Sequence, residues 1–198
     1  LSRVLGLVRD VTMASVFGTT LISDSFLLAW TLPNLFRRLC GEGALSSAFI
    51  PVYVRQKKID VASASKLAAA TATRLAICLF AIVAVIELAL LSVNSILNLG
   101  VDPLVIELSQ ILAPYLWFIC LAGLLFGLLQ SEGDFARPAL AAVILNVVWI
   151  AALASAMLLF ENPYSQVKWL ALLLLLGGGL QLLLQLNGSQ RLGVSLKP

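Results

Sequence analysis

The sequence contains no histidine, and charged residues make up only 12% of its 198 residues. A soluble domain of average composition carries about 25% charged residues. Histidine is the side chain most often used as a general acid or base near neutral pH, and it is a common metal ligand. Nucleophile–base pairs, metal-binding clusters and paired carboxylates at catalytic spacing are lacking as well. The sequence therefore predicts no enzyme, no bound metal and no cofactor.

Cysteine is also scarce. Cys40, Cys78 and Cys120 lie far apart in apolar runs, without a CxxC motif. This spacing supports neither a zinc site nor a disulfide framework, and we interpret the three cysteines as small buried hydrophobic residues. The net charge of +3 comes from 13 basic and 10 acidic residues scattered along the chain. So weak and dispersed a positive charge excludes nucleic acid as the expected partner.

Apolar residues are abundant instead. They make up 61% of the chain, and the mean hydropathy is +1.02. Several apolar runs reach the roughly 18 residues needed to span a bilayer. The fold class expected is all-α, a polytopic membrane helix bundle of about six transmembrane helices, forming a single membrane domain over residues 1–198. The helices are expected at residues 1–17, 23–54, 63–96, 104–129, 139–159 and 167–186.

Glycine and proline predict where these helices bend or end. Residues 18–20 form a turn, and Ser23 or Asp24 is the expected cap of the second helix. Pro33 and Pro114 predict kinks, and a break is expected at residues 41–44, before a short helical piece at 49–54 and a basic loop at 55–58. The glycine run at 177–179 lies inside a helix, so we interpret it as a packing feature rather than a phosphate-binding loop.

Basic residues orient the predicted helices in the membrane. Arg55, Lys57 and Lys58 follow the second helix, Arg137 follows the fourth, and Arg191 and Lys197 follow the sixth. Positively charged loops favour the cytoplasmic side, so an even number of helices places both ends of the chain in the cytoplasm. The chain begins with leucine and stops just after an apolar span, so we expect a fragment of a longer protein, truncated at both ends.

Charges are unusually frequent within the apolar, helix-length runs of the first 51 residues. They are Arg3, Arg9, Asp10, Asp24, Arg37, Arg38 and Glu42. A charge near the bilayer centre costs at least about 2.5–3.5 kcal/mol, so charges retained there usually have a function. We interpret them as a cavity between the first two helices, lined mainly by arginine and suited to an anionic ligand. Arginines near the interface that snorkel to lipid headgroups are the alternative.

Spacing indicates which of these charges meet. Arg3 and Asp10 are seven residues apart and share a helix face, whereas Arg9 points about a third of a turn away. Arg38 and Glu42 are four residues apart and can form an ion pair. The acidic residues are expected to hold the arginines in place and to lower the cost of removing them from water.

Five segments of the first 51 residues resemble the amino-terminal signature of the MurJ family, also called MviN. They are residues 2–10 (SRVLGLVRD), 17–18 (FG), 23–26 (SDSF), 32–39 (LPNLFRRL) and 41–51 (GEGALSSAFIP). This family comprises the bacterial lipid II flippases of the multidrug/oligosaccharidyl-lipid/polysaccharide exporter superfamily. Farther along, the resemblance rests on the helix pattern and on short pieces such as residues 113–115 and 145–146. Thr31 departs from the pattern, because relatives often carry a basic residue there.

The resemblance implies a fold of about fourteen helices in two pseudo-symmetric lobes around a central cavity, of which this chain would form the first lobe. It also implies that Arg3, Arg9, Asp24 and Arg37 line the cavity and bind the pyrophosphate of a lipid-linked precursor. Arg38 and Glu42 match further family positions and complete the candidate binding residues.

The expected function is that of a lipid II flippase. Such a protein moves the undecaprenyl-diphosphate-linked peptidoglycan precursor from the cytoplasmic to the outer leaflet of the bacterial inner membrane. The expected partners are lipid II, membrane lipids and the second lobe of the same protein. One alternative is a flippase for another lipid-linked oligosaccharide, or a drug exporter of the same superfamily, although exporters of cations should prefer acidic cavities. Another is a non-transporting membrane scaffold for cell-envelope assembly.

Overall fold

The computed structural model describes residues 2–41, 44–92 and 100–191, and the side chains of residues 2 and 40–46 are outside this description. These residues form helices and short connections, and they contain no strand. The helices are α1 (Ser2–Phe17), α2 (Leu21–Gly41), α3 (Ala44–Ile59), α4 (Val61–Ser92), α5 (Pro103–Leu112), α6 (Tyr115–Ser131), α7 (Ala136–Leu159) and α8 (Pro163–Arg191). The all-α prediction is confirmed.

Four helical stretches of the described residues are long and apolar enough to cross a membrane: α4, α5 together with α6, α7, and α8. The other two predicted spans correspond to α1 and to α2 together with the first part of α3. α1 has only 16 residues, and α2 carries Asp24, Arg37 and Arg38 within its 21 residues. The expected organisation of the bundle is therefore confirmed, with six as an approximate count of the spans.

Two details of the sequence prediction are wrong. The cap of α2 is Thr20 rather than Ser23 or Asp24, because the helix begins at Leu21 and the Thr20 hydroxyl accepts from the backbone N–H of Ser23 at 3.5 Å. The basic segment at 55–58 is not a loop but the last turns of α3. Lysine and arginine are good helix formers, and their positive charges are favourable near a helix C-terminus.

Proline and glycine break the helices close to the expected places. Pro114 separates α5 from α6, which together cover the fourth predicted helix. α2 continues through Pro33 to Gly41, and α3 begins at Ala44, whereas the centre of the predicted break at 41–44 lies outside the described residues. Gly18 has a φ of 56° in the turn between α1 and α2, a conformation that L side chains rarely adopt.

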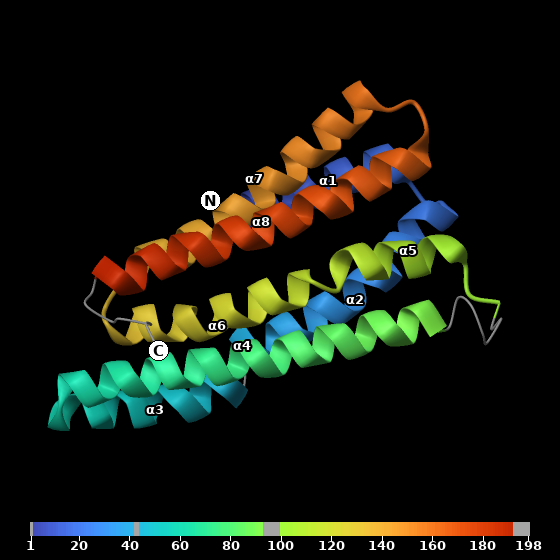
Figure 1. Cartoon of the computed structure of the whole chain (residues 1–198). Coiled ribbons are helices and arrows are strands. Elements are labelled where there is room, and N and C mark those ends of the chain that lie inside the picture. Colours follow the sequence, from blue (N-terminus) through green and yellow to red (C-terminus); the bar gives the residue numbers. More distant parts are fainter. Residues whose placement is uncertain (1, 42–43, 93–99, 192–198) are drawn as a thin grey trace.

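The basic segments gather at one end of the bundle. Figure 1 shows the α3–α4 connection, the α6–α7 connection and the end of α8 at that end, opposite the α1–α2 and α7–α8 turns. Glu132, which follows α6, forms an ion pair with Lys57 and accepts a hydrogen bond of 2.8 Å from the Tyr53 hydroxyl of α3. Burial and this hydrogen bond raise the pKa of Tyr53.

Two aspartates at the same end accept hydrogen bonds from the first residues of helices. Asp60 accepts hydrogen bonds from the hydroxyl and backbone N–H of Ser63, and these bonds hold the pKa of its carboxyl below the usual value. Asp134 accepts from the backbone N–H and the guanidinium of Arg137, with the same effect on its pKa. These contacts satisfy the N–H groups that open α4 and α7.

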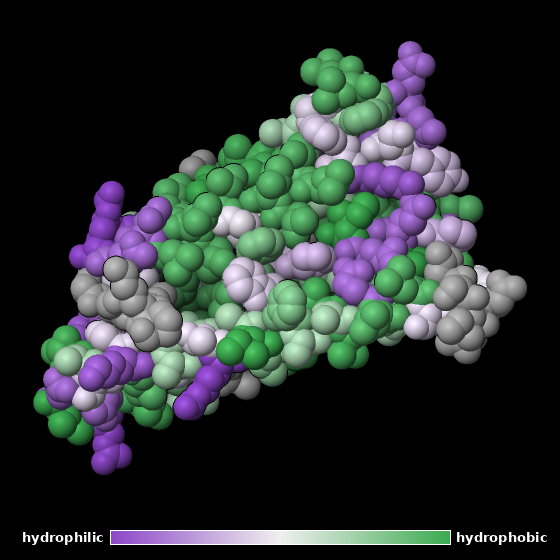
Figure 2. Space-filling model, viewed as in Figure 1, coloured by the Kyte–Doolittle hydropathy of each residue, from purple (hydrophilic) through white to green (hydrophobic). Residues whose placement is uncertain are grey.

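The surface of the bundle suits a lipid environment. Apolar residues cover the middle of the face seen in Figure 2, and hydrophilic residues gather towards its two ends. Exposed apolar side chains on α4 include Ile77, Phe80 and Val85. Cys78 is exposed beside them, so the prediction that the cysteines are buried is wrong for Cys78, whereas Cys120 is buried. In a membrane an apolar side chain need not turn towards the protein, because lipid tails are as apolar as leucine.

Buried side chains from distant parts of the chain hold the helices together. One core cluster joins α1, α2, α5, α7 and α8, a second joins α4, α6 and α8, and a third joins α3, α4 and α6. α8 packs closely on α6 because Gly178 has no side chain: a Cβ atom there would lie 2.7 Å from Cδ2 of Tyr115. The interpretation of the glycine run as a packing feature is confirmed.

Gly178→Ala is therefore expected to destabilise the protein. Overpacking costs about 1–3 kcal/mol, and the gain of alanine over glycine in a helix, about 0.5–1 kcal/mol, offsets only part of it. We expect the thermal unfolding midpoint in detergent to fall by several degrees. Gly179→Ala is the matched control, because the nearest neighbour of its Cβ would be a Phe118 ring atom at 4.0 Å. Equal midpoints for the two variants would contradict the close contact.

Candidate functional site: an arginine-lined cavity

A cavity of about 750 Å³ lies between α1, α2, α6, α7 and α8. Its walls are largely apolar, with aromatic side chains from α2 and α7 that include Phe26, Trp30 and Trp149. Three arginines line it, Arg9 from α1 and Arg37 and Arg38 from α2, together with one carboxylate, Asp10. The other polar side chains in the lining are Ser23, Asn34, Asn146, Gln181 and Gln185.

Arg9 is held from three directions. Its NH1 group donates to Oδ1 of Asn146 on α7 at 3.3 Å, and its Nε donates to Oδ1 of Asp10 at 2.8 Å. Its guanidinium carbon also lies 4.8 Å from the centre of the Trp149 ring, within the range of a cation–π interaction. These contacts fix the guanidinium plane at the cavity wall, although the side chain keeps 27% of its exposure.

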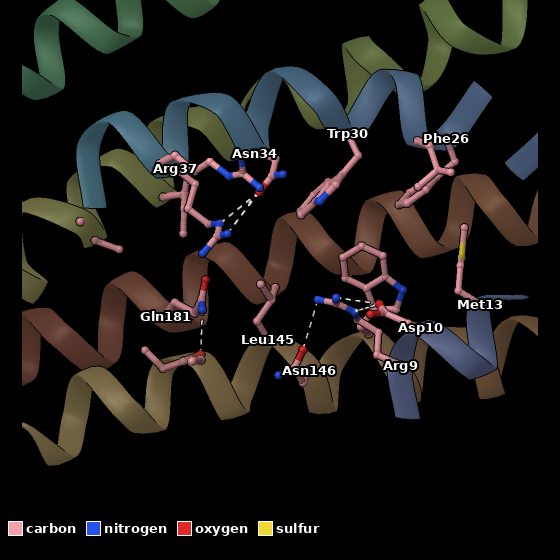
Figure 3. Close-up of a pocket in the computed structure, with 18 of the residues that line it drawn as sticks. Arg9, Asp10, Met13, Phe26, Trp30, Asn34, Arg37, Leu145, Asn146 and Gln181 are labelled. Carbon is pink, nitrogen blue, oxygen red and sulfur yellow. Dashed lines mark hydrogen bonds and ion pairs between the residues drawn. The ribbon is translucent and has the colours of Figure 1, made fainter. Parts of the chain in front are cut away.

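Arg37 is oriented by its own helix. Its Nε and NH2 groups donate to Oδ1 of Asn34, one turn earlier on α2, at 3.3 and 3.2 Å. Figure 3 shows Arg37 and Arg9 reaching the same cavity from different helices, with Leu145 of α7 between them. Two guanidinium groups at one cavity, each positioned by an asparagine oxygen, suit a ligand that carries more than one negative charge.

The structure places the six predicted binding residues differently. Arg9, Arg37 and Arg38 come together at the cavity, and Arg38 is also exposed. Arg3 and Asp24 are exposed and are not among the lining residues, and Glu42 lies outside the described residues. Asp24 is thirteen residues from Arg37 along α2, a distance of about 20 Å at 1.5 Å per residue. Asp10 pairs with Arg9, its neighbour in sequence, at 2.7 Å.

The sequence interpretation missed several residues of the cavity. Asn146, which orients Arg9, enters the sequence analysis only within the short piece 145–146 of the family resemblance, and Trp149 is not among the predicted residues. Gln181 and Gln185 were not singled out. A signal for them was present, because polar side chains inside apolar membrane helices usually serve a function, and these two lie four residues apart on one face of α8.

Comparisons with known proteins all point to one protein family. A family model described as "Lipid II flippase MurJ" matches residues 13–198. The "Lipid II flippase MurJ" of Burkholderia cenocepacia is 36% identical over 200 residues, covering 96% of this chain and 38% of that protein. The "Probable lipid II flippase MurJ" of Vibrio cholerae is 34% identical over 212 residues, covering 100% of this chain and 40% of that protein.

A solved structure shares the fold. It is titled "Lipid II flippase MurJ, inward closed conformation", and the two superpose with a TM-score of 0.73 at 25% sequence identity. The match covers 94% of this chain and 40% of the solved one. This chain thus spans about two fifths of the length of the proteins that it matches.

Proposed function

The chain belongs to the MurJ family of lipid II flippases, and we propose that it forms the amino-terminal lobe of a protein that moves lipid II across the bacterial inner membrane. As a member of this family the chain is part of a transporter, with membrane-spanning helices. The observation that carries the proposal is the placement of Arg9 and Arg37 at one cavity.

The chemistry of the cavity suits a diphosphate. Guanidinium groups bind phosphate oxygens through paired N–H donors, and these charge-assisted hydrogen bonds are the stronger kind. Asn34 and Asn146 orient the arginines through neutral oxygens, and Asp10, the one carboxylate among the described lining residues, pairs with Arg9. Arg38 adds a third positive charge at the same wall.

Three of the predicted binding residues, Arg3, Asp24 and Glu42, are not among the described residues that line the cavity. Arg3 and Asp24 are exposed on this lobe, so the role that the family resemblance implies for them depends on contacts with the second lobe or with lipid. Glu42 keeps its predicted role next to Arg38. All three stay in the proposal as residues that bind the substrate or orient the arginines.

The mechanism we propose keeps the two parts of the substrate in different surroundings. The polyprenyl tail stays in the bilayer, while the diphosphate and its sugars pass through the cavity between this lobe and a second one. Rocking of two lobes around a central site is the general scheme for such transporters. The end of the bundle with the basic segments faces the cytoplasm, because positively charged loops favour that side.

The other candidate functions fit the cavity less well. An exporter of cationic drugs would need acidic walls, and this cavity has three arginines against one carboxylate. A scaffold without transport would not need arginines at the wall of a cavity of this size. A flippase for another lipid-linked oligosaccharide would use the same diphosphate chemistry, so only the sugar distinguishes it from a lipid II flippase.

Arg9→Ala and Arg37→Ala are expected to abolish or severely reduce function in the full-length protein. Each change removes hydrogen bonds to a charged group, worth about 1.5–3 kcal/mol, where the diphosphate leaves water. The measurement is growth of a strain depleted of its own lipid II flippase, with the amount of each variant in the membrane checked. Lysine at either position should rescue growth only partly, because it keeps the charge but loses the planar pair of donors.

Arg55→Ala is the control for these variants. Arg55 is exposed near the end of α3 and does not line the cavity, so its removal should leave growth nearly normal. Normal growth with both cavity variants, under conditions where depletion alone is lethal, would refute the arginine-based mechanism.

The orientation gives a separate prediction. A cysteine placed at Gln56, in the last turns of α3, should react with a membrane-impermeant thiol reagent only from the cytoplasmic side. A cysteine at Val101, which is 42% exposed at the opposite end, should react from outside. The experiment needs a background in which the three native cysteines are replaced, because Cys78 is exposed. Labelling in the reverse pattern would overturn the proposed orientation.

A further inference from the structure

Two glutamines on α8 have buried oxygen atoms without a hydrogen-bond partner. Gln181 and Gln185 line the same cavity as the arginines, and they are only 5% and 3% exposed. The Oε1 atoms of both side chains are buried and accept no hydrogen bond from the described residues. A buried acceptor without a donor costs about 1–3 kcal/mol. Two such acceptors in one cavity wall therefore suggest that a bound ligand supplies the hydrogen-bond donors.

The orientation of Gln181 is fixed by the protein. Its Nε2 donates to the backbone oxygen of Ala141 on α7 at 2.7 Å, in a buried contact. This bond determines which end of the amide is the nitrogen, so the oxygen is left to face the other way. Figure 3 shows Gln181 and Arg37 pointing towards one another across the cavity. A buried acceptor therefore lies on the side of Gln181 that faces the guanidinium of Arg37.

The ligand group that fits these glutamines differs from the one that fits the arginines. An amide oxygen repels a phosphate oxygen, and it needs a hydroxyl or an N–H group to donate to it. Gln185 lies one helical turn beyond Gln181, about 6 Å along α8. Three arginines line the same cavity and would repel a cation, so these two neutral acceptors suit an uncharged group with several donors better than a metal ion.

We infer that Gln181 and Gln185 bind the sugar attached to the diphosphate, by accepting hydrogen bonds from its hydroxyl and amide N–H groups. The inference rests on the proposed function, because it takes the diphosphate to lie at Arg9 and Arg37. On this inference, the diphosphate and the sugar are bound by different helices of the cavity wall. α1 and α2 bind the charge common to all such lipids, and α8 distinguishes the group that the lipid carries.

The test compares two ligands with the full-length protein in detergent micelles. Lipid II carries the sugar, and undecaprenyl diphosphate lacks it. Gln185→Met keeps the length of the side chain and removes the acceptor, and it leaves the Gln181–Ala141 bond intact. We expect it to weaken lipid II binding roughly three- to tenfold, the effect of one neutral hydrogen bond, and to change the Kd for undecaprenyl diphosphate less than twofold. Gln181→Met should show the same selective loss.

The same substitution outside the cavity is the control. Gln110 lies on α5, away from the cavity lining, so Gln110→Met should change neither Kd. Retained binding of undecaprenyl diphosphate shows that each cavity variant is folded. Equal weakening of both ligands by the glutamine variants would overturn the inference, because the glutamines would then act through the arginines. Unchanged binding of both would overturn it as well.

Two further results separate the inference from its premise. A loss that disappears when choline replaces sodium in the buffer would identify a cation site and refute sugar binding. If Arg9→Ala and Arg37→Ala leave undecaprenyl diphosphate binding unchanged, the proposed diphosphate site itself is wrong. If those arginine variants lose both ligands while the glutamine variants lose neither, the proposed function stands and only the sugar assignment fails.

Discussion

The cost of keeping a guanidinium at the wall of a largely apolar cavity is the constraint on which this lobe depends. Arg9 meets it through Asn146, Asp10 and the Trp149 ring, which come from two helices more than 130 residues apart in sequence. Burying a charge without such partners would cost several kcal/mol. The contacts that stabilise the charge of Arg9 therefore also hold α1 against α7. These two helices form one wall of the cavity.

The rest of the bundle keeps that wall in place. Met13 and Phe17 of α1 and Phe26 of α2 pack in one core with Trp149 and residues of α5 and α8. Gly178 lets α8 approach Tyr115 of α6, whose ring also contacts Trp30 with 5.0 Å between ring centroids. Trp30 in turn packs edge-on against Trp149. A continuous set of aromatic contacts thus connects the α6–α8 packing to the residue that supports Arg9.

This arrangement gives the cavity two kinds of polar wall. The arginines of α1 and α2 offer strong donors to an anion, and the glutamines of α8 offer neutral acceptors. A diphosphate-linked sugar has both complementary groups in one molecule, with an apolar tail that can remain in the bilayer. In the proposed mechanism the polar substrate group leaves water here because each part of it meets a partner of opposite hydrogen-bonding character.

The sequence by itself determined the all-α membrane fold, the family, and the candidate arginines, because apolar runs, turn residues and charges in unfavourable places are local signals. Only the tertiary structure decided which charges share a cavity: Arg9, Arg37 and Arg38 line it, whereas Arg3 and Asp24 do not. It also revealed Asn146, Gln181 and Gln185, whose surroundings come from other helices. A side chain's partner across the bundle depends on how helices rotate and pack, and residue spacing within one helix cannot specify that.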